Sequence, residues 1–154
     1  MNKIIITMIL IMTSNFLSAG ARFTDNGDGT VRDNGTGLLW QKCSYGQSTP
    51  DCSGIGGTRT WQQSLQYCRN LPLAGRSWRL PNVNELKSIV DFSSYAPAIN
   101  TIFFPNTHTS YYWSSSTVSL DVDNAWFVAF GLGGNVQYSE KTLGYYVRCV
   151  TDGP

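Results

Sequence analysis

Charged residues are scarce in this chain, and histidine occurs once. Among 154 residues there are 11 Lys and Arg and 10 Asp and Glu, which gives a net charge of +1. Because duplex binding draws much of its affinity from Lys and Arg on phosphates, and no basic run exceeds a pair, the sequence argues against a nucleic-acid partner. A hydrophobic content of 42% excludes a disordered chain and predicts one folded domain with a real core.

Long hydrophobic runs are also missing, apart from one at the N-terminus. Lys3 precedes an apolar run at 4–12, and the small residues 19–21 have the spacing that a signal peptidase reads. The run is shorter than the ~20 residues needed to span a bilayer. We therefore predict that residues 1–21 are a cleaved signal peptide. The mature domain, 22–154, is then exported to the periplasm, cell surface or medium, without a stable membrane span.

Four cysteines fit an oxidising compartment, where disulfides are favoured over metal ligation. Cys43 and Cys52 bracket a short loop of small, polar, turn-forming residues, so a local bridge is the economical one of three possible pairings. Cys68 then pairs with Cys149. In the chain-entropy model these closures stabilise the fold by about 2.7 and about 4.5 kcal/mol. The even count leaves no cysteine over as a reactive thiol.

Two capping boxes predict the starts of two helices: Thr60 with Gln63, and Asn82 with Glu85. From 93 to 109 no periodicity is visible, which predicts a long irregular connection. Short alternating or apolar runs between turn residues predict strands on both sides of the helices. The predicted helices cover 61–71 and 83 to about 92, and the predicted strands cover 23–24, 30–32, 38–40, 111–115, 125–130, 135–138 and 145–150.

Several short motifs follow one another along nearly the whole predicted mature chain: Phe23–Val31, Thr36–Lys42, Trp61–Cys68, Trp78–Leu86, Tyr112–Ser116 and Tyr146–Val150. In this order they resemble the C-terminal domain of the Legionella collagen-like adhesin and its bacterial relatives. The resemblance implies an α+β, C-type-lectin-like fold, with two helices packed on a twisted, mostly antiparallel sheet with long irregular loops. It also implies a disulfide from the first helix to the last strand, in agreement with Cys68 and Cys149.

Motifs that relatives of this fold use for calcium binding or catalysis are missing here, which reduces the number of possible functions. The Glu-Pro-Asn and Trp-Asn-Asp motifs of calcium-dependent lectins are absent, and Asp121, Asp123 and Asn124 are too few for a calcium site of six to eight oxygens. Formylglycine-generating enzymes, which the Arg79-Leu80-Pro81 stretch resembles, need free cysteines. His108 has no evident orienting partner, so we predict a solvent-facing histidine. We accordingly predict no enzyme, no metal and no cofactor.

Arg79 lies between Trp78 and Leu80, which predicts a partly buried guanidinium that holds loop carbonyls. The alternative is an anion clamp, such as a sulfate site, which requires Arg69 and Arg76 to converge with Arg79 on one exposed face. All five tryptophans are predicted core residues.

Adjacent tyrosines occur twice, at Tyr111-Tyr112 and Tyr145-Tyr146. Neighbours in a strand point to opposite faces, so at least one of each pair should leave the core and be free to stack on a sugar. We therefore predict a secreted, non-enzymatic recognition module that binds a glycan or polysaccharide without calcium. The alternative is an assembly subunit that binds another envelope or appendage protein. The predicted binding residues are Tyr111, Tyr112, Asp121, Asp123 and Asn124.

Overall fold

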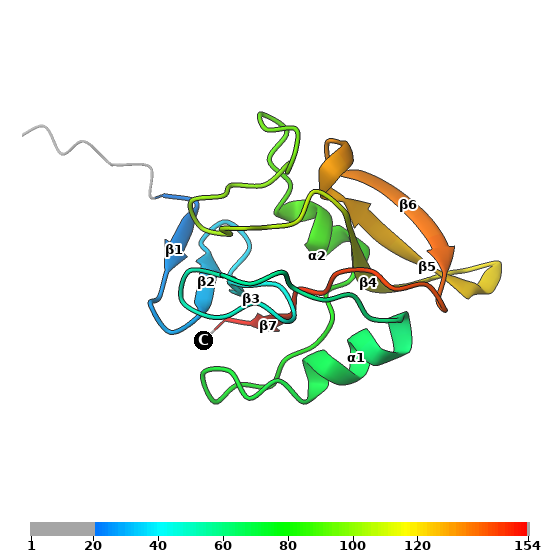
Figure 1. The fold of residues 1–154 in the computed structure, drawn as a ribbon, viewed down its shortest axis with the longest axis horizontal. Helices are drawn as coiled ribbons and strands as arrows, with labels where there is room; N and C mark the ends of the chain where they lie inside the picture. The colour runs from blue at the N-terminus through cyan, green and yellow to red at the C-terminus, as the bar shows by residue number, and fades with distance from the viewer. Residues whose placement is uncertain (1–20, 154) are drawn as a thin grey trace, which may run out of the picture.

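Two antiparallel sheets and two short α-helices make up the part of the chain that the computed structural model describes, residues 21–153 (Figure 1). The α+β class is confirmed, with two separate sheets in place of the single sheet predicted. The predicted signal peptide lies outside the described residues except for Ala21. No helix within 21–153 is long and apolar enough to cross a membrane.

The first sheet has the strand order β1-β2-β3-β7 and lies on the left of Figure 1. Its strands are β1 (Phe23–Asp25), β2 (Thr30–Asp33), β3 (Leu38–Gln41) and β7 (Val150–Asp152). β1 and β2, which contain the strands predicted at 23–24 and 30–32, form an antiparallel hairpin. Gly27 and Gly29 in its turn both have positive φ, at 76° and 88°, a backbone conformation that is unfavourable for residues with a Cβ atom.

The second sheet, β4-β5-β6, lies on the right of Figure 1. It consists of β4 (Tyr111–Val118), β5 (Asp121–Ala129) and β6 (Asn135–Glu140), and the short 3-10 helix η1 (Phe130–Leu132) connects the last two. β5 begins four residues before its predicted start at Ala125, because the β4–β5 hairpin continues into a polar end where Val118 pairs with Asp121.

Both predicted capping boxes are present. Thr60 caps α1 (Trp61–Arg69) with Gln63, and Asn82 caps α2 (Val83–Ser88) with Glu85. Each box satisfies backbone donors that the first helical turn leaves free. α2 ends four residues before the predicted position. The apolar side chains that follow the helix, beginning with its C-cap residue, still point into the core, although their backbone is no longer helical.

Both predicted disulfides are confirmed. Cys43 bonds Cys52 within a loop, and Cys68 of α1 bonds Cys149 just before β7. The second bridge lies in a core cluster with Trp78, Trp113 and Phe127.

The predicted strand at 145–150 is wrong for most of its length. The backbone is extended, but its hydrogen-bond partners belong to different parts of the chain rather than to one neighbouring strand. Tyr145 pairs with Arg59, Tyr146 with β4, and the carbonyl of Val147 accepts from Tyr45. Only from Val150 onward does a regular ladder form, with β3. This long segment therefore connects the two sheets.

Three of the five tryptophans, Trp40, Trp78 and Trp113, are buried as predicted. Trp61 and Trp126 are only partly buried. Trp61 is the first residue of α1, and Trp126 packs edge-on against the exposed Tyr138 of β6.

Candidate functional site

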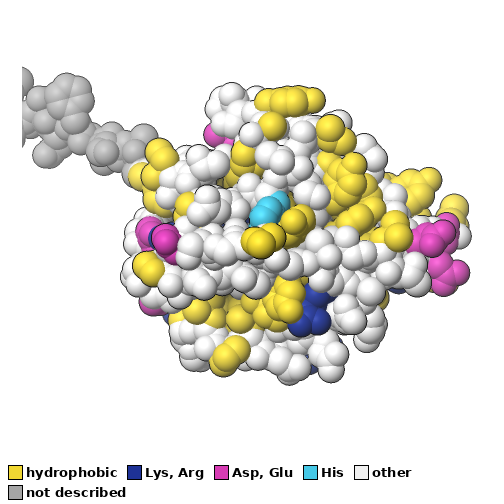
Figure 2. Space-filling view, viewed as in Figure 1, with side chains coloured by type: hydrophobic (Ala, Val, Ile, Leu, Met, Phe, Trp, Pro, Cys, Tyr) yellow, Lys and Arg dark blue, Asp and Glu magenta, His cyan; other side chains and the backbone are white. Residues whose placement is uncertain are grey.

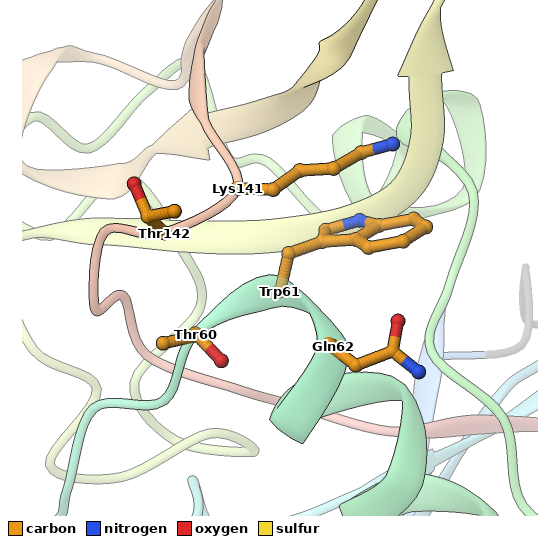
Figure 3. Close-up of a pocket in the computed structure, with 5 residues that line it drawn as sticks. All are labelled: Thr60, Trp61, Gln62, Lys141 and Thr142. Atoms are coloured by element: carbon orange, nitrogen blue, oxygen red, sulfur yellow. The ribbon is translucent and has the colours of Figure 1, made fainter.

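A groove of about 560 Å³ opens at the start of α1. We call it the Trp61 groove, and Figure 3 shows the residues that line it: Thr60, Trp61, Gln62, Lys141 and Thr142. The first three come from the N-terminal end of α1 and the other two from the segment after β6. Two distant parts of the sequence therefore form its walls.

Trp61 is held in the groove by its backbone and by its ring. Its backbone N–H donates to the carbonyl of Lys141 at 3.0 Å, and its indole Nε1 donates to the carbonyl of Ser114 at 2.8 Å. The capping box fixes the helix start around it. A donor at each end of the residue is thus satisfied, which leaves the ring with one orientation at the rim of the groove.

Lys141 lies along one face of the Trp61 indole (Figure 3), with its ammonium 4.1 Å from the ring centroid. The same ammonium donates to the hydroxyl of Thr117 at 3.0 Å and to the carbonyl of Val122 at 2.7 Å. A cation over an indole contributes about 0.5–1 kcal/mol at an exposed site. Because its hydrogen bonds are already made within the domain, Lys141 acts as a wall of the groove.

A second hollow, of about 450 Å³, adjoins the groove and shares Lys141 and Thr142 with it. We call it the acidic hollow. Figure 2 shows acidic side chains gathered at this end of the second sheet. Its lining residues are Asp121, Asp123, Asn124, Glu140, Lys141 and Thr142.

The structure brings together the three predicted oxygen-bearing residues Asp121, Asp123 and Asn124. The amide of Asn124 donates to the carboxylate of Asp121 at 2.6 Å. They lie within β5, although the strand was predicted to begin only after them, at Ala125, because the hairpin ladder reaches past the core. Ligand binding by these residues stays a prediction.

The two predicted tyrosines are not exposed. Tyr112 is 0% exposed, and its hydroxyl forms a 2.8 Å hydrogen bond with that of Ser44. Tyr111 is partly buried, with its ring 4.9 Å from that of Phe127 and 5.2 Å from that of Tyr145. The prediction that Tyr112 is available for stacking is wrong, because both faces of this part of the sheet are covered.

The tyrosines and the acidic hollow also lie at opposite ends of the same strand pair. Tyr111 pairs with Ala129 at one end, and Val118 pairs with Asp121 at the other. The five predicted binding residues therefore do not form one site. An aromatic residue that does adjoin the oxygen-bearing ones, across the shared Lys141 and Thr142, is Trp61, which was predicted to be a core residue. Its position directly after the cap, at the end of a short helix, was the available signal for a rim position.

His108, predicted to face solvent, is only partly exposed. Its ring stacks on Tyr146 at a centroid distance of 4.1 Å, and its Nε2 atom is buried without a hydrogen-bond partner among residues 21–153. Burial lowers the pKa of His108 below its usual value, and the nearby charge of Arg148 lowers it further. The irregular connection thus packs its histidine against the C-terminal segment through this stack and leaves part of the ring at the surface (Figure 2).

Arg79 also differs from its prediction. Its side chain is 44% exposed, and it donates to both carboxylate oxygens of Glu85 at 2.7 Å and to Asp152 at 3.2 Å. The hydrogen bonds to Glu85 raise the pKa of Arg79 despite partial burial. The predicted contact with loop carbonyls is wrong, because the guanidinium is hydrogen-bonded to carboxylates of α2 and β7 instead. Arg79 therefore connects α2 to the first sheet.

The buried guanidinium belongs to Arg148, which is 0% exposed. It donates to the backbone carbonyls of Gln41 and Lys42 and to the hydroxyls of Ser44 and Thr107. Within the described part of the chain it has no carboxylate partner. Burial lowers the pKa of Arg148. The sequence near Arg148 does not identify these partners, because they come from two distant segments, 41–44 and the irregular connection that contains Thr107.

These features define a disulfide-linked α+β domain with a tryptophan-lined surface groove and an adjoining acidic hollow. No cluster of three or more His, Cys, Asp or Glu residues placed to hold a metal ion occurs within 21–153. Residues 29–151 match the Lcl C-terminal domain, and the chain therefore belongs to that family. A comparison with curated proteins gave no match. The more specific C-type-lectin-like assignment stays a prediction.

Proposed function

We propose that this domain is an exported, non-enzymatic recognition module that binds glycans without calcium in the Trp61 groove and the acidic hollow. Its family supports an adhesin-related role. The two disulfides are compatible with an oxidising compartment outside the cytoplasm.

The observation that carries the proposal is the junction of an aromatic wall with a group of hydrogen-bonding oxygens. Trp61 offers apolar ring surface, while Asp121 and Asn124 in the adjoining hollow offer carboxylate and amide groups. Sugars present apolar C–H patches beside hydroxyl groups, so both parts of the surface have a matching part of the ligand. The fixed indole adds affinity, since little side-chain freedom is lost on binding.

The charges around the hollow favour a neutral ligand over a sulfated one. Asp121, Asp123 and Glu140 contribute three carboxylates, against one ammonium from Lys141 that is already hydrogen-bonded. A sulfate there would meet net negative charge. Binding of neutral sugars should depend weakly on salt, because no long-range attraction is available to be screened.

The test is a glycan array carrying neutral and sulfated saccharides, read with and without EDTA and at low and moderate salt. Neutral glycans are expected to bind, with the signal unchanged by EDTA. Trp61→Ala should weaken binding about tenfold, a typical loss for a central tryptophan. Phe92→Ala is the matched control, since Phe92 is 73% exposed and lines neither the groove nor the hollow.

Three results would contradict the proposal: loss of binding in EDTA, equal binding by Trp61→Ala and wild type, or strong heparin retention that falls steeply with salt. The last result would favour the anion clamp of Arg69, Arg76 and Arg79. All three arginines are exposed, although Arg79 is engaged by Glu85 and Asp152.

A further inference from the structure

The outer edge of β6 presents unpaired backbone groups. Lys141 N–H donates to the carbonyl of Asp123 at 2.9 Å, in register with the β5–β6 ladder. In an antiparallel pair, successive residues point their backbone groups alternately toward the partner strand and away from it. The residues of β6 that bond to β5 are therefore Asn135, Gln137 and Ser139. Those whose N–H and C=O groups point outward are Val136, Tyr138 and Glu140.

Residues 21–153 leave most of this edge uncovered. The carbonyl of Glu140 accepts from Leu143, but no hydrogen bond reaches the backbone of Val136 or Tyr138 from the described part of the chain. The opposite edge of the same sheet differs: on β4, Trp113 N–H donates to the carbonyl of Tyr146 and is covered. β6 is therefore the free edge of the second sheet (Figure 1).

β6 lacks the usual protection of an edge strand. Proline, lysine and bulges commonly block such edges. The sequence Asn-Val-Gln-Tyr-Ser-Glu has neither proline nor lysine, and its register with β5 is continuous. Tyr138 is 56% exposed and packs edge-on against Trp126 at a centroid distance of 5.4 Å. An exposed aromatic surface thus lies directly beside the unpaired backbone groups.

The charges at one end of the β6 edge indicate which kind of partner would bind there. β6 ends at Glu140, next to Asp121 and Asp123, and Lys141 is the one ammonium in that lining. In a two-fold pairing of two copies centred on Tyr138, Glu140 would face Val136 of the other copy, so neither carboxylate would gain a positive partner. A basic side chain opposite Glu140 would form a favourable cross-strand pair.

We propose that the β6 edge binds an extended segment of another protein by adding a strand to the second sheet. The segment carries apolar side chains at alternate positions, which pack on Tyr138 and Trp126, and a Lys or Arg opposite Glu140. Strand addition of this kind takes its affinity from main-chain hydrogen bonds and its specificity from alternate side chains. This binding goes beyond the proposed glycan recognition and suits the assembly role that the sequence left as an alternative.

The probes are three blocked nine-residue peptides of alternating Val and Thr, ended on both sides by Lys, Gln or Glu. With basic residues at both ends, either strand direction places one near Glu140. Binding is measured by fluorescence anisotropy, and amide hydrogen exchange of the folded full domain is followed by NMR. The Lys-ended peptide should bind best, with Gln- and Glu-ended peptides roughly two- to fivefold weaker per charge pair lost. The amides of Val136 and Tyr138 should exchange more slowly in its presence.

Tyr138→Pro is the decisive variant, because it removes an outward N–H and leaves the β5–β6 hydrogen bonds in place. Tyr138→Thr is its control, since it loses the ring and keeps the N–H. Peptide binding should be lost in the proline variant, be weakened in the threonine variant, and show no charge preference in Glu140→Gln. Glycan-array binding should be unchanged in Tyr138→Pro, which separates the two proposals.

Two sets of results would overturn the inference. The first is equal peptide binding by Tyr138→Pro and Tyr138→Thr, or no slowing of exchange at Val136 and Tyr138 in the wild-type domain at millimolar peptide. The exchange measurement decides the case even if the proline variant does not fold. The second is a concentration-dependent dimer of the wild-type domain that Tyr138→Pro abolishes, which would make a second copy the occupant.

Discussion

Lys141 holds Trp61 in two ways: its carbonyl accepts the backbone N–H of Trp61 at 3.0 Å, and its ammonium lies 4.1 Å from the centre of the indole ring. The start of α1 and the end of β6 are joined through this pair. The wall of the proposed glycan groove therefore depends on a contact between residues that are far apart in the sequence.

Lys141→Met should lower the free energy of unfolding by about 1 kcal/mol, because it removes the cation from the ring and two hydrogen bonds while keeping most of the side-chain volume. Chemical denaturation followed by tryptophan fluorescence measures the change. Lys87→Met is the control, since Lys87 is exposed on α2. Equal stability of the two variants would show that the Lys141 contacts contribute nothing.

Removal of the long-range disulfide should cost more stability than removal of the local one. The bridges span 81 residues for Cys68–Cys149 and 9 residues for Cys43–Cys52. In the entropy model the corresponding losses are about 4.5 and about 2.7 kcal/mol. The measurement compares the unfolding free energies of the two double-alanine variants, which leave no unpaired thiol. A larger loss for Cys43→Ala/Cys52→Ala would reject the entropic explanation here.

Arg79→Ala should lower the unfolding free energy by about 1 kcal/mol, the upper end for an exposed pair, because the contact with Glu85 is bidentate. Arg76→Ala is the matched control, since the guanidinium of Arg76 forms no ion pair within residues 21–153. If Arg79→Ala instead abolishes glycan binding at unchanged stability, Arg79 belongs to a ligand site.

Glu85 should make stability sensitive to acid. Burial raises the pKa of Glu85, but hydrogen bonds from Arg79 and from the backbone of Asn82 outweigh burial, so its folded-state pKa lies below the ordinary 4.5. The stabilisation that Glu85 gives the folded state is thus complete above about pH 4.5 and is lost as the pH falls through the folded-state pKa. Denaturation curves of Glu85→Gln should lack this part of the acid loss. Parallel pH profiles of wild type and variant would contradict the assignment.

His108 should add a second pH dependence to the free energy of unfolding, at milder pH than Glu85. Its folded-state pKa is depressed by burial and by Arg148, so the unfolded chain binds more protons just below pH 6.5. The free energy of unfolding is then highest above about pH 6.5 and falls as the pH drops toward the folded-state pKa. His108→Phe keeps an aromatic ring for Tyr146 and removes the titration. Its stability should be flat across this range, and a slope equal to that of wild type would contradict the role of His108.

Local sequence signals predicted the features that depend on neighbouring residues. The capping pairs Thr60–Gln63 and Asn82–Glu85 were found because an N-cap acts on a backbone group three residues away. The site was predicted in part. Asp121, Asp123 and Asn124 are adjacent in sequence and in space, while Trp61 was missed because its partner Lys141 comes from a distant segment.

The burial of particular polar and aromatic side chains could not be predicted in this way. A strand pattern states that Tyr111 and Tyr112 point to opposite faces, but not that other segments cover both faces. Likewise, nothing near Arg148 in the sequence indicates the carbonyls of Gln41 and Lys42 that receive its guanidinium. Arg79 and Arg148 both have apolar residues on either side in the sequence, yet only Arg148 is buried.

The sequence by itself determined the α+β class, the family and the disulfide pairing, together with the capped helix starts and most strand positions. The class and the family follow from the resemblance that the ordered motifs carry, the disulfide pairing from the short loop between Cys43 and Cys52, and the helix starts and strands from short-range patterns. The tertiary structure alone decided that 145–150 connects two sheets, that Trp61 meets the acidic hollow, and that the edge of β6 is left open. Each of these depends on which distant segments pack together, and packing between distant segments is set by the whole core rather than by any local pattern.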